Sequence, residues 1–178
     1  MESSKGINRA LATVGLGVIS GIVLGIITNW FNGSLSPSYF AFLFDLDTGN
    51  MPELAIAQGM MEGAMIGGVL GVVVATIVLL LTKGEANLRV NVRLLLSIVF
   101  LALSAWVIGG AIGVAIAAVS PDFYSYYGSQ HESRTGVMAF AWVGGSIRGI
   151  EVGAILATLL ACANFWVRHD RAVEPGSA

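Results

Sequence analysis

Charged residues are scarce in this chain: Asp, Glu, Lys and Arg make up 11% of its 178 residues, while 56% are hydrophobic. Soluble domains carry about 25% charged residues. This deficit excludes an ordinary soluble domain and indicates an integral membrane protein in contact with a lipid bilayer. The net charge is −2, and nothing in the sequence suggests binding to nucleic acid.

Cysteine and histidine are equally scarce. The single cysteine, Cys162, excludes a disulfide within the chain. The two histidines, His131 and His169, fall outside the long apolar runs on opposite sides, so they cannot jointly ligate a haem within the membrane. The acidic run at 45–50 lacks the spacing of an EF-hand loop. We therefore expect no metal site and no other cofactor.

Residue combinations typical of enzymes are missing as well. The sequence shows no nucleophile with a neighbouring base, no phosphate-binding loop and no helical His-x-x-x-His pair. An enzymatic function is the least supported class, and we expect the protein not to be an enzyme.

Long hydrophobic runs are what the chain has instead. Four runs exceed the roughly 20 residues that a helix needs to cross the hydrocarbon core. They cover about 10–31, 55–82, 93–119 and 137–167. We predict an all-α membrane protein with a single four-helix transmembrane domain at 9–168, preceded by a short segment at 1–8 and followed by a polar tail at 169–178. The aromatic loop at 32–53 is expected to hold a short interfacial helix.

Positive charges are distributed unevenly between the two sides of the predicted bundle. If the N-terminus is cytoplasmic, most Lys and Arg fall on the cytoplasmic side and only Arg134 falls on the other. This asymmetry follows the positive-inside rule and predicts cytoplasmic N- and C-termini in a cell (inner) membrane. The cytoplasmic cations are Lys5, Arg9, Lys83, Arg89, Arg93, Arg168 and Arg171.

Small residues recur at every fourth position in all four runs. This spacing lines one face of a helix and lets another helix backbone come close. We therefore predict glycine-zipper packing, with some faces left for self-association or other subunits. The predicted packing glycines are Gly17, Gly21, Gly25, Gly59, Gly63, Gly67, Gly71, Gly109, Gly113, Gly145, Gly149 and Gly153.

The order of these features suggests an internal repeat. Ser36-Pro37 and the aromatic residues after it recur 84 residues later at Ser120-Pro121, and the glycines of the second run recur 86 residues later in the fourth. Each half is then a helical hairpin, and the two halves are related by an axis near the membrane normal. The alternative is that glycine-rich membrane helices look alike by chance. In the repeat, the stretch Gly59–Gly71 has its matching surface in Gly145–Gly153.

Three ionisable residues lie within the predicted spans: Glu62, Arg148 and Glu151. The repeat places Glu62 opposite Arg148, and Glu151 shares a helix face with Arg148. One interpretation is an ion-paired cluster, in which the Arg148 guanidinium holds both carboxylates and locks the halves together. The other is a polar path for protons, ions or a small substrate. We favour locking, because charges of both signs compensate each other.

These features favour a non-enzymatic function. The leading hypothesis is a structural or accessory subunit that packs into a larger membrane complex or a homo-oligomer. The alternative is a small channel or transporter with an intramembrane Glu/Arg polar centre. A membrane-embedded assembly factor is a third, weaker hypothesis.

Overall fold

A computed structural model describes residues 2–45, 50–124 and 133–173, and this part of the chain is all-helical. Four helices are long and apolar enough to cross a membrane, so the protein is a multi-pass integral membrane protein, as the sequence predicts. They are α1 (Glu2–Leu35), α3 (Met51–Thr82), α4 (Leu88–Val119) and α6 (Arg134–Val173). Two short helices, α2 (Pro37–Phe44) and α5 (Pro121–Tyr124), follow α1 and α4.

Local sequence signals set the ends of these helices. Proline occupies the first turn of α2 and of α3, where its missing N–H costs nothing. After α3, Lys83 and Gly84 adopt left-handed conformations with φ of 52° and 83°, a common way to end a helix. The Asn87 side chain then caps α4 by accepting a hydrogen bond from the Arg89 N–H at 3.2 Å. The chain therefore reverses direction within a few residues.

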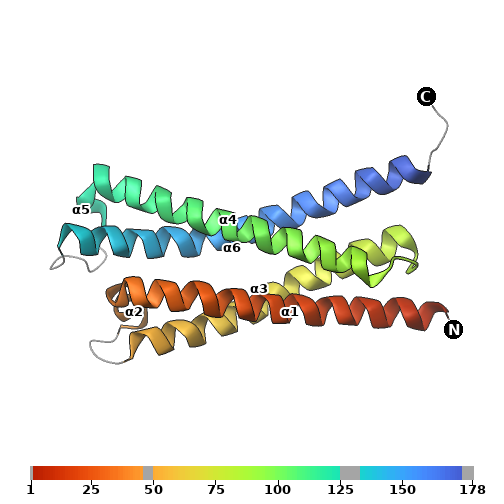
Figure 1. Cartoon of the computed structure of the whole chain (residues 1–178), viewed down its shortest axis with the longest axis horizontal. Helices are drawn as coiled ribbons and strands as arrows, with labels where there is room; N and C mark the ends of the chain where they lie inside the picture. The colour runs from red at the N-terminus through yellow and green to blue at the C-terminus, as the bar shows by residue number, and fades with distance from the viewer. Residues whose placement is uncertain (1, 46–49, 125–132, 174–178) are drawn as a thin grey trace.

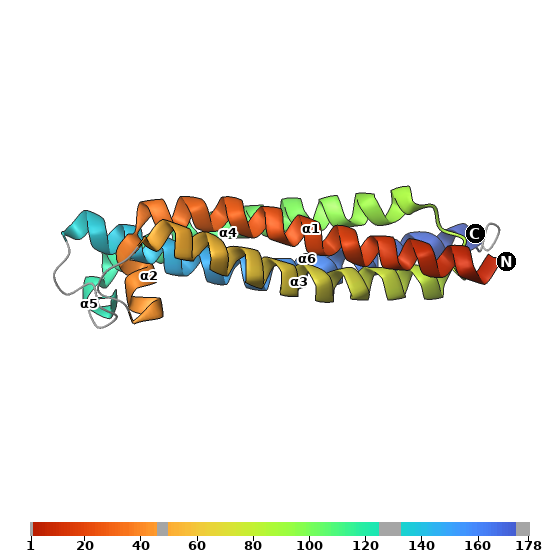
Figure 2. The same ribbon diagram turned by 90° about the horizontal axis from the view of Figure 1, so that it is seen from below.

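The four long helices pack as two hairpins. Helix α1 packs along α3, and α4 packs along α6, whereas contacts between these two pairs are sparse. Figure 1 shows the pairs one above the other, with the two helices of each pair crossing near the middle. The beginning of α1 and the end of α6 lie at the same end of the bundle, and α2 and α5 lie at the opposite end (Figure 2).

Two separate clusters of buried apolar residues join the hairpins. The cluster nearer the termini consists of Val74, Val78, Leu95, Ile98, Ala157 and Cys162. The cluster nearer α2 consists of Phe40, Met51, Ala55, Val143 and Ile147. Each cluster takes residues from both hairpins, so the hairpins are held together at two levels along the bundle.

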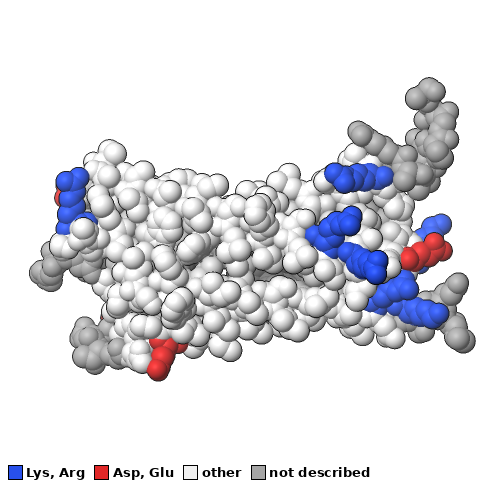
Figure 3. All heavy atoms as spheres, viewed as in Figure 1, with Lys and Arg blue, Asp and Glu red and all other residues white. Residues whose placement is uncertain are grey.

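Most charged side chains gather at the ends of the bundle; Glu62, Arg148 and Glu151 lie within the long helices instead. On the face shown in Figure 3, Lys and Arg cluster at the end where α1 begins, and the long middle part is uncharged. Large apolar side chains cover the outside of the bundle; Leu80 is 71% exposed and Phe100 is 69% exposed. Such a surface implies contact with lipid, and the accumulation of cations at one end is typical of membrane proteins.

The helices extend beyond the predicted spans. Helix α1 already begins at Glu2, and α6 continues to Val173, into the predicted polar tail. The 40 residues of α6 correspond to about 60 Å, twice the thickness of the hydrocarbon core. Helix α6 is therefore longer than a helix needs to be to cross the hydrocarbon core. The short helix expected within 32–53 is confirmed as α2.

Candidate functional site

Glycine pairs bring the backbones of α1 and α3 into direct contact. The opposed pairs are Gly17–Gly67, Gly21–Gly63 and Gly25–Gly59. A Cβ atom placed on Gly17 would lie 2.5 Å from the carbonyl oxygen of Gly67, and at Gly21 and Gly25 the overlap with the opposing carbonyl would be more severe. Even alanine does not fit at these positions, so the close approach requires glycine.

The second hairpin uses the same kind of contact with two alanines included. The opposed pairs between α4 and α6 are Gly109–Gly145, Gly113–Ala141 and Ala105–Gly149. A Cβ atom on Gly113 would overlap the carbonyl oxygen of Ala141. Glycine on one helix is thus sufficient for the backbones to approach where the other helix carries alanine.

The stretch Gly59–Gly71 faces α1 and not Gly145–Gly153, so the expected pairing of these two stretches is wrong. Gly71, at the end of the stretch, lies against the backbone of Thr13 and Val14. All four long helices carry similar small-residue faces, and α1, which is joined to α3 through residues 36–50, is nearer to α3 in sequence than α6 is. Pairing with α1 therefore closes a shorter loop than pairing with α6 would. Each face is therefore already occupied within its own hairpin.

Arg148 pairs with Glu151 and not with Glu62. Nη1 of Arg148 lies 2.8 Å from Oε2 of Glu151, one helical turn away. Glu62 instead accepts a hydrogen bond from Nε2 of Gln58 at 2.9 Å, also one turn away. The predicted ion pair between Glu62 and Arg148 is thus replaced by two local contacts, because partners at i,i+3 and i,i+4 are always within reach on a helix.

The charged residues lie far from the basic end of the bundle. Arg148 precedes Arg168 by 20 residues, and Glu62 precedes Lys83 by 21 residues. Both separations correspond to about 30 Å of helix, the thickness of the hydrocarbon core. The Arg148 side chain is 77% exposed on the outside of α6, whereas Glu151 is 29% exposed. At this depth, an arginine can extend its guanidinium toward the lipid head groups.

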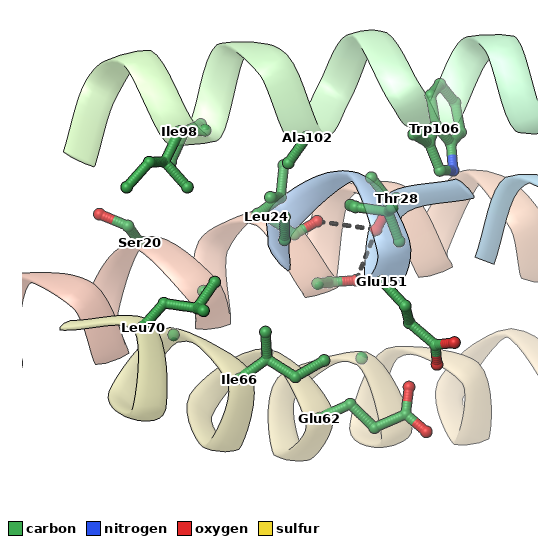
Figure 4. A pocket seen from close by; sticks show the side chains of 18 of the residues that line it. Ser20, Leu24, Thr28, Glu62, Ile66, Leu70, Ile98, Ala102, Trp106 and Glu151 are labelled. Atoms are coloured by element: carbon green, nitrogen blue, oxygen red, sulfur yellow. Dashed lines mark hydrogen bonds between the residues drawn. The ribbon is translucent and has the colours of Figure 1, made fainter. Parts of the chain in front are cut away.

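A cavity of about 100 Å³ lies between the two hairpins, and all four long helices line it (Figure 4). Much of its wall is formed by the packing glycines of α1 and α3 and by apolar side chains such as Leu24, Ile66 and Ile98. Glu62 and Glu151 both line the cavity, and Figure 4 shows their side chains extending toward one another. The structure therefore brings the two predicted carboxylates to one site.

Several polar residues of this site were not identified from the sequence. Asn32 is completely buried, and its Oδ1 accepts a hydrogen bond from Oγ of Ser146 at 3.2 Å. Asn29 lies four residues after Gly25, and Asn32 lies three residues after Asn29. Both asparagines therefore continue the glycine face of α1. That spacing is the signal that could have placed both asparagines on the cavity wall.

Helix α2 lies against the part of α6 that precedes the charged pair. The ring of Tyr39 lies 5.1 Å from that of Phe140. Burial raises the pKa of the Tyr39 hydroxyl above its ordinary value of 10.0; Arg148 lowers it, and Glu151 and Glu62 raise it further. Tyr39 is therefore close enough to Glu62, Arg148 and Glu151 for all three charges to shift its pKa.

Among the residues that the structure describes, no three His, Cys, Asp or Glu side chains come together in a group that could hold a metal ion. Residues 46–49 of the acidic run and His131 lie outside the described part of the chain.

The comparisons with known proteins found no match to the chain among protein-family models, curated proteins or solved structures.

Proposed function

We propose that the protein is a non-enzymatic membrane subunit that packs through the outer face of α6 into a homo-oligomer or a larger membrane complex. The observation that carries this proposal is the α6 seam, defined as Arg148, Val152, Ile155 and Leu159. These residues follow one another at spacings of four, three and four. All four are exposed on the outside of the bundle.

The α6 seam has the pattern of a helix–helix contact. Apolar residues at alternating spacings of three and four form a continuous stripe that a second helix can cover, and one polar residue in such a stripe fixes the register. Arg148 supplies the polar residue. Its Nη1 donates to Glu151, and a guanidinium has five N–H donors in all. The other donors can therefore bind a carbonyl or carboxylate group of a neighbouring chain.

The mass of the full-length protein, extracted in mild detergent, tests this proposal. We expect a homo-oligomer or a complex with co-purifying subunits. Val152→Trp should dissociate it by adding bulk to the seam. Val107→Trp, on the exposed side of α4, is the matched control and should leave the mass unchanged. A wild-type monomer without partners contradicts the proposal.

A small channel or transporter is the second candidate, favoured by the cavity between the hairpins. Glu62 and Glu151 line the cavity, and Arg148 pairs with Glu151 at its edge. Because the remaining wall is mostly apolar, conduction would require the hairpins to move apart. Proton or cation flux into vesicles that contain the protein tests this function. Flux should fall in Glu62→Gln, and a wild-type protein without flux at any pH or potential rules the function out.

We further infer that the hairpins are two copies of one repeat and that the basic end faces the cytoplasm. The repeat is supported by the similar glycine contacts and by the Ser-Pro sequences that begin α2 and α5. The orientation is supported by the cations near the termini. In a Cys162→Ala background, a cysteine introduced at Ser133 should react with a membrane-impermeant reagent added outside intact cells, and one at Glu85 should not.

A further inference from the structure

The basic end of the bundle carries cations that no carboxylate of the described residues neutralises. Among these residues, only Arg148 and Glu151 form an ion pair, and they lie far from this end. The Arg9 side chain is bound to the turn between α3 and α4, because its Nη1 donates to the carbonyl oxygens of Gly84 at 3.3 Å and of Ala86 at 3.0 Å. The exposed cations of this end are Lys5, Lys83, Arg89, Arg93 and Arg168.

Arg89 and Arg93 lie on one outer face of α4. They are four residues apart, so their side chains are neighbours on the helix surface. Both are exposed, and neither forms an ion pair with a described carboxylate. Like charges at this spacing repel each other and destabilise the helix. An anion bound by both guanidinium groups would remove this repulsion.

Arg168 of α6 lies at the same level of the bundle. Phe165 packs against the buried cluster that contains Leu95. Arg168 follows Phe165 by three residues. Arg93 precedes Leu95 by two. Since α4 and α6 are antiparallel, both arginines lie within about 5 Å beyond this contact, toward the same end.

The basic side chains of α4 and α6 also share one face of the molecule. In Figure 3, such side chains lie over the beginning of α4 and over the end of α6. Nε of Arg168 donates to Oδ1 of Asn164 at 3.0 Å. The other N–H groups of this guanidinium remain available to an anion.

The face of α4 that carries the two arginines continues into an apolar surface. Leu96 and Phe100 follow Arg93 by three and seven residues, so they lie on the same side of the helix. Both are exposed on the outside of the bundle. The span predicted for α4 begins at residue 93, and an arginine at the end of a span lies at the level of the lipid head groups. The face therefore has cations at head-group level and apolar side chains at acyl-chain level.

This profile favours a lipid over an anion from the water phase. Guanidinium groups bind phosphate with two parallel hydrogen bonds. A free phosphate or an acidic protein would use only the arginines, whereas a phospholipid also covers Leu96 and Phe100. A choline or ethanolamine cation beside the phosphate would be repelled by the same arginines. The matching head group therefore carries a net negative charge.

We propose that Arg89, Arg93 and Arg168 bind the head group of one anionic phospholipid in the leaflet at the basic end. The guanidinium groups bind its phosphate, and one acyl chain lies along Leu96 and Phe100. This binding requires neither the α6 seam nor ion flux, so it can be tested separately from both proposed functions.

Native mass spectrometry of the purified full-length protein tests this assignment, with dioleoylphosphatidylglycerol as the probe. We expect one tightly bound probe molecule per chain. Dioleoylphosphatidylcholine has the same acyl chains and a head group without net charge, and it should bind at least about tenfold more weakly. Glycerol 3-phosphate, which lacks acyl chains, should not displace the probe at equal concentration. Equal binding of the phosphatidylcholine, displacement by glycerol 3-phosphate, or no bound probe overturns the proposal.

Charge-removing variants locate the site. Arg93→Gln and Arg168→Gln should each weaken probe binding about fivefold, the effect of one basic residue near an anionic lipid surface. Combining Arg89→Gln with Arg93→Gln should weaken it about 25-fold. These side chains are exposed, so the substitutions should leave the fold intact.

The matched control is Lys5→Gln, which removes the same charge from the same end but on α1, in the other hairpin. Because exposed charges are screened by salt over distance, it should change probe binding by less than about twofold. Wild-type binding by the double variant contradicts the site. Equal weakening by Lys5→Gln and Arg93→Gln also contradicts it, since the lipid would then respond only to the net charge of this end.

Discussion

The contacts within the hairpins differ from the contacts between them. Within the first hairpin, glycines on α1 and α3 place backbone against backbone, with no space for a Cβ atom. Between the hairpins, contacts are sparse and are made by side chains, and a cavity of about 100 Å³ separates them along the bundle. Each hairpin is thus one closely packed unit, and the bundle is two such units joined loosely.

This difference indicates where the molecule can change shape. Helices in lipid gain little from the hydrophobic effect when they associate, so close van der Waals packing and hydrogen bonds must hold them together. The hairpins have abundant close packing. Their mutual interface has two apolar clusters and two buried side-chain hydrogen bonds, Asn91–Thr13 and Asn32–Ser146, within the described residues. Movement of one hairpin against the other is therefore less costly than opening either hairpin.

The largest effect is expected where a side chain is added inside a hairpin. In Gly21→Leu, the new side chain overlaps the carbonyl oxygen of Gly63 and forces α1 away from α3. We expect a loss of at least about 3 kcal/mol in the free energy of unfolding, at the upper end of overpacking effects. Thermal or detergent-induced unfolding of the purified protein measures this loss.

The matched control is Gly15→Leu on the same helix. A Cβ atom at Gly15 has nothing within 4 Å, so the change should be within about 0.5 kcal/mol. If the two variants lose stability equally, the backbone contact does not hold the hairpin together.

The sequence predicted the elements of this fold better than their pairing. The length of the four hydrophobic runs is enough to identify the four long helices. A single segment of that length within lipid can pair its backbone N–H and C=O groups only as a helix. The small-residue faces also follow from spacing. Which face meets which does not, because Gly59–Gly71 could match either α1 or α6 by composition.

The candidate site was predicted only in part for the same reason. The sequence identifies Glu62, Arg148 and Glu151 as unusual charges, but the partner of each depends on rotamers and on local i,i+3 and i,i+4 alternatives. The cavity could not be predicted from spacing, since it arises from imperfect packing between two hairpins. The contribution of Trp106 to its wall could likewise be recognised only after α4 had been placed against α1.

A smaller effect is expected for a hydrogen bond between the hairpins. Ser146→Ala removes the donor to Oδ1 of Asn32 and leaves that buried amide without a partner among the described residues. We expect a loss of about 1–2 kcal/mol, measured by the same unfolding assay. Ser104→Ala, which removes an exposed hydroxyl that bonds only its own helix, should change stability by less than about 0.5 kcal/mol. A loss for Ser146→Ala as large as that for Gly21→Leu would remove the distinction between the two kinds of contact.

The smallest effect is expected for the charged pair on α6. Arg148→Gln, Glu151→Gln and the double variant form a thermodynamic cycle, and we expect a coupling energy below about 1 kcal/mol. The pair is local to one helix, and the Arg148 side chain is 77% exposed, so solvent or head groups screen it. The equivalent cycle for Arg148 and Glu62 should give a coupling close to zero, because Glu62 is held by Gln58. If that second coupling is the larger one, charge does bridge the hairpins. In that case, the interface between the two hairpins is stabilised by the ion pair between Arg148 and Glu62 that the sequence predicts.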